Sequence, residues 1–346
     1  MALLHVLSPV KAPYVKKVSR FLWGFLVIGT LLSYASVWVS PLTFQWSGFV
    51  SLLIPVFLII NFILLLLQLF IRPKRAIVPL VLILIGFRFI TASIAVGPSN
   101  SEEGLKVLNY NITRVNIAAD QNLGMEMVDW LADVEADVKC FQEFLNRPLL
   151  VNALSRELRY SYIDGYAGSF AIFSRYPIVN TGKLYEDKRK NNILFADLAV
   201  NRDTVRIYNV HLQSMAINVD DVVDSERLKE RYQVVGRKFG EGSVTRARQV
   251  KKLIEHASNS PYPTILTGDF NDIPYSFNYM QLAAAFDNAF EHGGRGFGFT
   301  YNGKLPFLRI DNQFYSEGIA VNKFETLSDI KYSDHHPVLG IYSLSD

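Results

Sequence analysis

The chain has 346 residues, half of them hydrophobic, and a formal net charge of +3 that is unevenly distributed. Residues 1–100 contain eight Lys and Arg residues and no Asp or Glu, whereas residues 101–346 contain the other 27 basic residues and all 32 acidic ones, a net of −5. This length accommodates a large enzyme domain plus a second part, and the single cysteine, Cys140, excludes an intramolecular disulfide.

Three apolar stretches in the first part, at about 21–39, 48–71 and 76–96, each have the roughly 20 residues that a helix needs to cross a bilayer. We therefore predict an all-α membrane domain of three transmembrane helices over residues 1–97, followed by a polar linker at 98–104. Lys and Arg lie in the N-terminal tail and the second loop but not in the first loop, which favours a cytoplasmic N-terminus. Three crossings then place the rest of the chain outside the cytoplasm.

Residues 105–346 alternate between strand and helix patterns without forming regular βαβ units, which favours a mixed sheet or a pair of sheets covered by helices. Runs rich in β-branched and aromatic residues predict strands at 105–112, 137–143, 169–174, 193–200, 204–212, 263–266, 309–315 and 337–342. Helical spacing predicts helices at 121–135, 148–158, 228–235, 244–257 and 281–290. The long polar connection over 214–243 is a candidate lid or substrate-facing arm.

Polar side chains follow many of these strands at the point where each strand ends. The most prominent stretch is Thr267–Asp272, which follows an apolar run and contributes Asp269 and Asn271. Alone, such residues are more often turn formers than catalysts. The set extends over the whole domain, however, and comprises Asn111, Glu143, His211, Asp269 with Asn271, Asp311, and the cluster Ser333–Pro337.

This set suits metal-assisted displacement at phosphorus. Carboxylate and carboxamide oxygens bind hard cations such as Mg²⁺, which keeps several waters and accepts a phosphate oxygen as a further ligand. Mn²⁺ favours the same oxygen ligands and remains an alternative. Histidine adds a proton carrier near neutral pH.

Six segments in order resemble the motifs of the endonuclease/exonuclease/phosphatase superfamily: Val107–Ile112, Phe141–Glu143, Asn209–Leu212, Thr267–Asn271, Arg309–Asp311 and Ser333–Val338. The resemblance covers essentially all of residues 104–346. It implies an α/β fold of two packed mixed β-sheets flanked by helices, a four-layer α/β/β/α sandwich. It also implies a Mg²⁺-dependent hydrolase acting on phosphoric ester bonds.

Carried over position by position, the resemblance implies a role for each motif residue. Glu143 would be the main metal ligand, supported by Asn111, with Asp334 beside the metal. His335 would be the general acid/base, oriented by Asp311, and His211 would contact the phosphate. Asp269 would orient or deprotonate the attacking water, and Asn271 would hold a phosphate oxygen as charge develops. Which group is the base stays open.

Several residues have a functional and a structural interpretation. Arg246 could contact substrate phosphate or lie on a solvated helix face, and His336 is expected to be structural. Arg88, inside the third apolar stretch, could contact a lipid head group or extend toward the interface. Asn312 and Thr113 depart from the family pattern, and Thr113 puts a second metal site in doubt.

Three functions remain open at this stage. The first is a membrane-tethered, divalent-metal-dependent phosphodiesterase whose substrate is a phospholipid or another envelope phosphodiester, with membrane lipids as partners and no protein partner predicted. The second is an extracytoplasmic nuclease, which the net of −5 disfavours because nuclease affinity rests largely on neutralising phosphates. The third is an inactive membrane scaffold.

Overall fold

The computed structural model describes residues 11–97, 101–112, 121–145, 148–165, 168–186, 191–214, 228–303 and 307–344. Thr113, residues 98–100 of the expected linker and residues 215–227 of the expected arm lie outside these ranges. The chain divides into two compact units, Met1–Ile90 and Thr91–Asp346.

The first unit is helical in its described residues. It comprises α1 (Lys11–Ser36), α2 (Ser47–Ser51), α3 (Ile54–Ile71), the 3₁₀ turn η1 (Pro73–Arg75), α4 (Ile77–Ile85) and the beginning of α5 (Phe87–Ser93). A buried polar contact joins two of these helices, because Asn61 of α3 donates from Nδ2 to Thr30 Oγ1 of α1 at 3.0 Å. Gly29 allows the close approach, since a Cβ there would lie 2.6 Å from the Phe57 ring. Asn61 therefore packs helix against helix, as helices in apolar surroundings often do.

The prediction of three membrane spans is only partly confirmed. Among the described residues one helical segment, Ser47–Ile71, is long and apolar enough to cross a membrane, and the bent pair Pro73–Ile85 and Phe87–Ser93 would be a second if it forms one span. The bend of 54° falls at Gly86, where a Cβ would lie 2.4 Å from the Tyr34 hydroxyl oxygen. Helix α1 does not qualify, and its apolar half includes Thr30, Ser33 and Ser36. Length and composition thus support one or two spans rather than three.

The second unit contains two six-stranded mixed sheets. Sheet I has the order β10-β12-β9-β8-β7-β6 and sheet II the order β13-β14-β2-β3-β5-β4. Each has one parallel pair, β8 with β9 and β2 with β3, and its other pairs are antiparallel. The bounds in sheet I are β6 Ile178–Lys183, β7 Ile193–Val200, β8 Asp203–His211, β9 Thr264–Asp269, β10 Asp287–Asn288 and β12 Asp311–Tyr315. Those in sheet II are β2 Leu105–Asn111, β3 Val138–Gln142, β4 Tyr160–Asp164, β5 Phe170–Ser174, β13 Ile319–Thr326 and β14 Val338–Leu344. The short strands β1 (Ala95–Val96) and β11 (Arg295–Gly296) pair separately.

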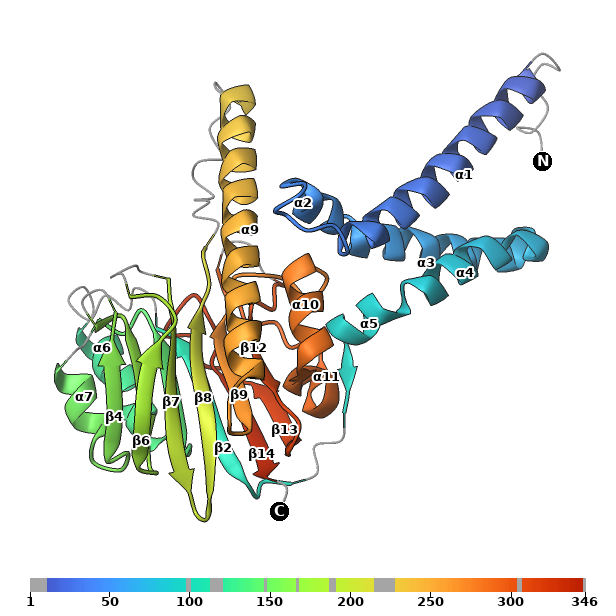
Figure 1. Ribbon diagram of the computed structural model, residues 1–346. Coiled ribbons are helices and arrows are strands. Elements are labelled where there is room, and N and C mark those ends of the chain that lie inside the picture. The colour runs from blue at the N-terminus through green and yellow to red at the C-terminus, as the bar shows by residue number, and fades with distance from the viewer. Residues whose placement is uncertain are drawn as a thin grey trace. The chain divides into compact units, whose positions relative to one another are not determined.

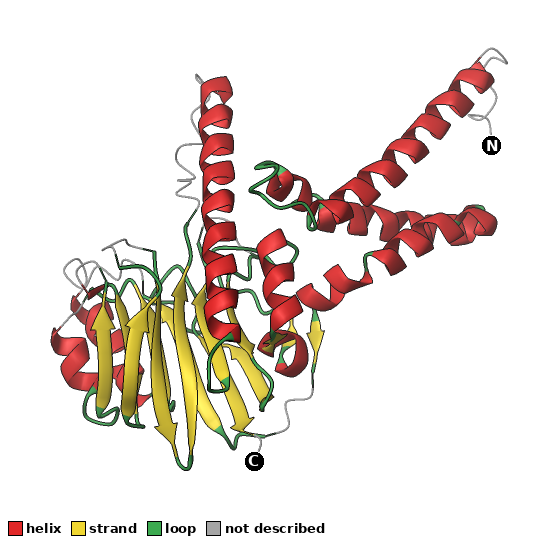
Figure 2. Ribbon diagram, viewed as in Figure 1, coloured by secondary structure: helices red, strands yellow, loops and turns green. Residues whose placement is uncertain are grey.

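The sheets pack face to face, with helices on their outer faces (Figures 1 and 2). The core between the sheets includes Val107 and Cys140 of sheet II and Ile207 and Ile265 of sheet I. Helices α6 (Gln121–Asp133) and α7 (Pro148–Leu154) cover sheet II, and α9 (Leu228–Ser258) and α10 (Phe277–Ala285) cover sheet I, with α11 (Ala289–Gly293) nearby. The predicted pair of mixed sheets flanked by helices is therefore confirmed.

Two helices differ from the sequence prediction. The segments 228–235 and 244–257 belong to one continuous helix, α9, which runs through Gly236, Gly240 and Gly242. The helix expected at 281–290 runs instead from Phe277 to Ala285, and the Ser276 side chain caps its start by accepting from the Tyr279 amide at 3.1 Å. Strands β4, β6 and β13 were not predicted.

Candidate active site

Strand register brings the predicted polar residues together at one end of the sandwich. In sheet I, Asp269 at the end of β9 pairs with His211 at the end of β8 and with Asp311 at the start of β12. Alternation along each strand places these three on the same face as Ile207, Ile265 and Tyr315, which is the face that packs against sheet II. Asn111 ends β2 on the facing side of sheet II, on the same side of its strand as Val107.

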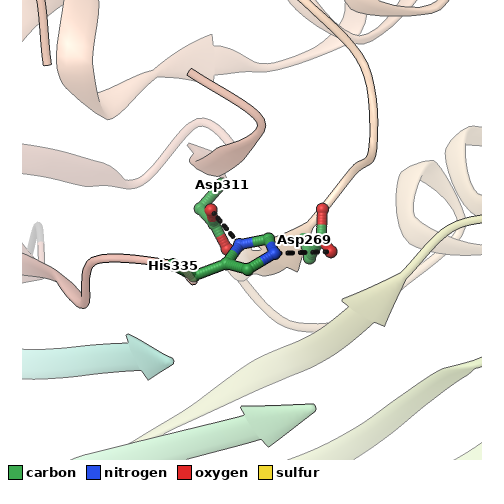
Figure 3. Close-up of side chains that lie close together, drawn as sticks. All are labelled: Asp269, Asp311 and His335. Atoms are coloured by element: carbon green, nitrogen blue, oxygen red, sulfur yellow. Dashed lines mark hydrogen bonds and ion pairs between the residues drawn. The ribbon is translucent and has the colours of Figure 1, made fainter. Parts of the chain in front are cut away.

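His335 lies between two buried carboxylates (Figure 3). Its Nδ1 is 2.8 Å from Asp311 Oδ2, and its Nε2 is 3.9 Å from Asp269 Oδ2. The short contact fixes the orientation of the ring and directs Nε2 toward Asp269. The predicted Asp311–His335 pair is thus present in the structure.

Nitrogen groups surround one oxygen atom, Asp269 Oδ2. Asn111 and Asn271 donate to it from Nδ2 at 3.1 and 3.0 Å, and His211 Nε2 lies 3.7 Å away. The backbone amide of Asn271 also donates to Asp269 Oδ1 at 2.8 Å. Because Asn111 gives its amide nitrogen to Asp269, its Oδ1 is the atom that would serve as a metal ligand. Glu143 Oε1 lies 4.0 Å from the same His211 Nε2.

Backbone turns after two strands aim the site residues. Strand β9 ends at Asp269, and Asn271 beyond it has a φ of 50°. This left-handed conformation folds the Asn271 amide back onto Asp269. Glu143 has a φ of 54° directly after Gln142. Strict alternation would point Glu143 away from sheet I, so this turn explains its approach to His211.

The two histidines have opposite pKa shifts. Burial lowers the pKa of His211, and the charge of Asp269 only partly opposes this effect. Burial also acts to lower the pKa of His335, but the charges of Asp311 and Asp269 outweigh it and raise that pKa to about 10. Burial raises the pKa of Asp269 against the opposing charge of His335. At neutral pH the site therefore combines a neutral His211 with a protonated His335.

Several residues that received no role of their own from the sequence support the site. Ser333 Oγ donates to the Asn111 carbonyl at 2.8 Å, which links the His335 loop to β2. Thr300 Oγ1 accepts from the Asp311 amide at 3.0 Å, and the Tyr301 ring packs edge-on against His335. Below the site, Gln142 Nε2 donates to Asn109 and Asn209, both at 2.7 Å, so a buried polar contact connects the two sheets. Ser333, Asn109, Gln142 and Asn209 each lie within two residues of a predicted site residue, whereas Thr300 and Tyr301 carry no such sequence signal.

The remaining predicted residues have defined surroundings. Arg246 is 1% exposed, and its guanidinium donates to Asp272, to the Gln213 carbonyl and to Ser243. These bonds lie within the fold, so neither of the two interpretations considered for Arg246 describes its contacts.

Asp334 is half-buried and accepts from Ser333 at 3.3 Å. His336 donates from Nδ1 to the Ile330 carbonyl at 2.8 Å, within its own loop.

The donor set fits a hard divalent cation. Ligand atoms of Asp269, Asp311 and His335 lie within 4.8 Å of one another and could hold an ion. However, His335 and Asp311 already hydrogen-bond each other. The Glu143 side chain is 41% exposed, and its carboxylate lies 4.0 Å from His211 Nε2. Oxygen donors from Glu143 and Asn111 match the preference of Mg²⁺ for carboxylate and carbonyl ligands.

A model of the endonuclease/exonuclease/phosphatase family matches residues 116–335, which is more than half of the chain. The chain belongs to the endonuclease/exonuclease/phosphatase family. The match includes every predicted site residue except Asn111, which precedes it. Members of this family are typically metal-dependent phosphoesterases. A second family model, a domain of unknown function termed DUF8431, matches residues 16–93 of the helical unit. No curated protein matches the chain.

Solved structures share the family fold at low sequence identity. The catalytic domain of human Nocturnin with bound sulfate is 16% identical, covers 71% of this chain and 96% of its own length, and has a TM-score of 0.52. D. rerio TDP2 complexed with a single-strand DNA product is 15% identical, covers 70% of this chain and all of its own length, and has a TM-score of 0.50. At these identities the similarity shows the fold alone.

Proposed function

We propose that this chain is a membrane-tethered, divalent-metal-dependent phosphodiesterase that directs a water molecule at a phosphate ester, with a phospholipid or another envelope phosphodiester as substrate. The observation that carries the proposal is the position of His335 between Asp311 and Asp269, with two carboxamides on the same Asp269 oxygen. The apolar helical segment Ser47–Ile71 supports the membrane tether. The basic flanks of the first hundred residues support a cytoplasmic N-terminus and an extracytoplasmic catalytic unit.

Each residue of the site has its own role in the proposed reaction. Asp269, whose pKa burial raises, accepts a proton from the attacking water. His335 is protonated at neutral pH and presents Nε2–H to a phosphate oxygen or to the leaving group, while Asp311 holds its ring. Asn271 and His211 provide neutral groups beside the phosphate. Glu143 and Asn111, with Asp334 nearby, would hold Mg²⁺, which when bound neutralises charge on the phosphate and orients it.

The test is a Mg²⁺-dependent activity panel with the full chain in neutral lipid nanodiscs. The substrates are bis(p-nitrophenyl) phosphate, phospholipid vesicles, DNA and RNA, each with and without a chelator. We expect hydrolysis of the small diester and of lipid, and a loss of about a thousandfold in Asp269→Asn because the proton acceptor is removed. Asp287→Asn, which changes a 60% exposed carboxylate of the same sheet, is the matched control.

Each outcome of the panel has a defined meaning. Unchanged turnover in Asp269→Asn contradicts the site assignment. DNA or RNA cleavage far above lipid turnover replaces the lipid proposal with the nuclease alternative. A well-folded chain without activity on any substrate, with or without metal, supports the scaffold instead.

A further inference from the structure

The helical unit contains a hollow of about 710 Å³ that the catalytic proposal does not use. Four cationic side chains line it: Arg20 of α1, Arg72 at the end of α3, and Lys74 and Arg75 of η1. Ser19 and Trp23 of α1 complete the wall on one side. Basic residues about 50 positions apart in the sequence therefore converge on one space.

The unit supplies no charge to balance these cations. Residues 1–90 contain no Asp or Glu, so a carboxylate partner within this unit is excluded by the sequence itself. Among the described residues, none accepts a hydrogen bond or ion pair from the side chains of Arg20, Arg72, Lys74 or Arg75. Four positive charges lining one hollow repel each other, and an anion that enters it relieves this repulsion.

We propose that this hollow binds the phosphate group of an anionic ligand, and that an acidic phospholipid supplies it. Arginine presents a planar fork of donors that matches phosphate oxygens, and two or more such forks can share one phosphate. The helices beside the hollow carry large exposed apolar side chains, including Ile59, Phe62 and Phe70 of α3. Such a surface suits acyl chains, and basic pockets between membrane helices are suited to acidic head groups.

Trp23 strengthens the choice of a lipid over a small ion. An indole ring is amphipathic and is favoured at the level of lipid head groups, where one side meets apolar chains and the other meets water. Trp23 lies one turn from Arg20 on α1 and lines the same hollow. A site for inorganic phosphate alone has no need of such a ring.

Ligand-dependent thermal stabilisation of the full chain in neutral detergent tests the proposal. The probes are dioctanoyl phosphatidylglycerol, dioctanoyl phosphatidylcholine and inorganic phosphate, and affinity follows from the rise of the unfolding midpoint with ligand concentration. We expect the phosphatidylglycerol to bind and the zwitterionic phosphatidylcholine not to. The triple variant Arg72→Gln/Lys74→Gln/Arg75→Gln should weaken phosphatidylglycerol binding about a hundredfold, at roughly fivefold per cation. Stabilisation by inorganic phosphate that the triple variant abolishes would support the phosphate site with a soluble anion as its ligand.

A matched pair of single variants keeps the test independent of folding. Arg20→Gln removes a lining cation, whereas Lys17→Gln removes an exposed cation one turn away on the same helix that does not line the hollow. Arg72→Lys/Arg75→Lys keeps the charge and should retain most of the binding. Equal stabilisation by both lipids, wild-type affinity in the triple variant, or equal losses in Arg20→Gln and Lys17→Gln would each overturn the proposal. The proposal does not depend on catalytic activity, so a failed activity panel leaves its outcome unchanged.

Discussion

The two histidines of the site face the same Asp269 oxygen yet have opposite charge states. His335 has a buried carboxylate on each side and a pKa of about 10, whereas His211 packs against the Phe170 ring and has a lowered pKa. Among the described residues His211 Nδ1 has no hydrogen-bond partner. Asp311 is the main difference between them. One additional carboxylate therefore separates a proton donor from a neutral contact within a single site.

Substitution of the two histidines, one at a time, should produce the largest losses of activity. His335→Ala should lower kcat/KM for a phosphodiester about a thousandfold, because the cationic donor beside the reacting phosphate is lost. His211→Ala should lower kcat/KM by a tenth of that factor, about a hundredfold, since a neutral donor contributes less to a charged transition state. Steady-state kinetics on the full chain at pH 7 measure both. A loss in His211→Ala equal to or greater than that in His335→Ala would contradict the division of roles.

Asp311→Asn should lower the pKa of His335, so that its charge state at neutral pH approaches that of His211. Asp311 and Asp269 raise the pKa of His335, so neutralising Asp311 lowers it and leaves a smaller protonated fraction at neutral pH. If activity requires protonated His335, it falls as the pH rises through that pKa. We therefore expect a loss of about tenfold at pH 7 and an alkaline limb that moves to lower pH.

The pH profile separates this effect from a structural one. A rate loss that is uniform across pH, with the alkaline limb unmoved, would mean that Asp311 only positions the ring. Activity of Asp311→Asn that recovers toward the wild-type value at acidic pH would support the charge effect.

Local sequence patterns predicted the residues of the candidate site, and nonlocal strand pairing determines how they lie together. Polar residues at the ends of apolar runs indicated Asn111, His211 and Asp269, and all three are buried in the fold. The register that sets His211 and Asp311 beside Asp269 joins segments far apart in the sequence, and no local pattern encodes it. The Asp311–His335 pair was implied only by the family resemblance. The left-handed turns at Glu143 and Asn271 also escaped prediction, because such conformations are uncommon for residues other than glycine.

The predicted helix bounds were least accurate where glycines interrupt the helical sequence pattern or lie within an apolar stretch. Gly236, Gly240 and Gly242 weaken the helical pattern, yet α9 continues through them because tertiary packing outweighs local propensity. The opposite happened at Gly86, where an apolar stretch that looked continuous is broken and bent. Composition alone could not distinguish the helix that continues through its glycines from the one that bends at Gly86, because the result depends on the residues that pack against each helix.

Arg246 supports the chain segments beside His211. Of the substitutions discussed, Arg246→Gln should have the smallest effect on activity. From α9 it bonds Asp272 and the Gln213 carbonyl, and Gln249, one turn away, accepts from the Gln213 amide at 2.9 Å. The two side chains thus hold the segments that follow β8 and β9. Arg246→Gln should reduce the free energy of unfolding by about 3 kcal/mol, because the buried Asp272 loses its partner. Denaturant unfolding measures this loss.

The controls distinguish support of the strand ends from substrate binding. Arg248→Gln changes an exposed residue of the same helix and should alter stability by less than about 0.5 kcal/mol. Adding Asp272→Asn to Arg246→Gln should restore part of the stability, because no unpaired charge is then buried. Under this interpretation kcat falls severalfold while KM changes little. Unchanged stability together with a raised KM would instead make Arg246 a substrate contact, and the buried bonds seen here would have to open for it to reach the phosphate.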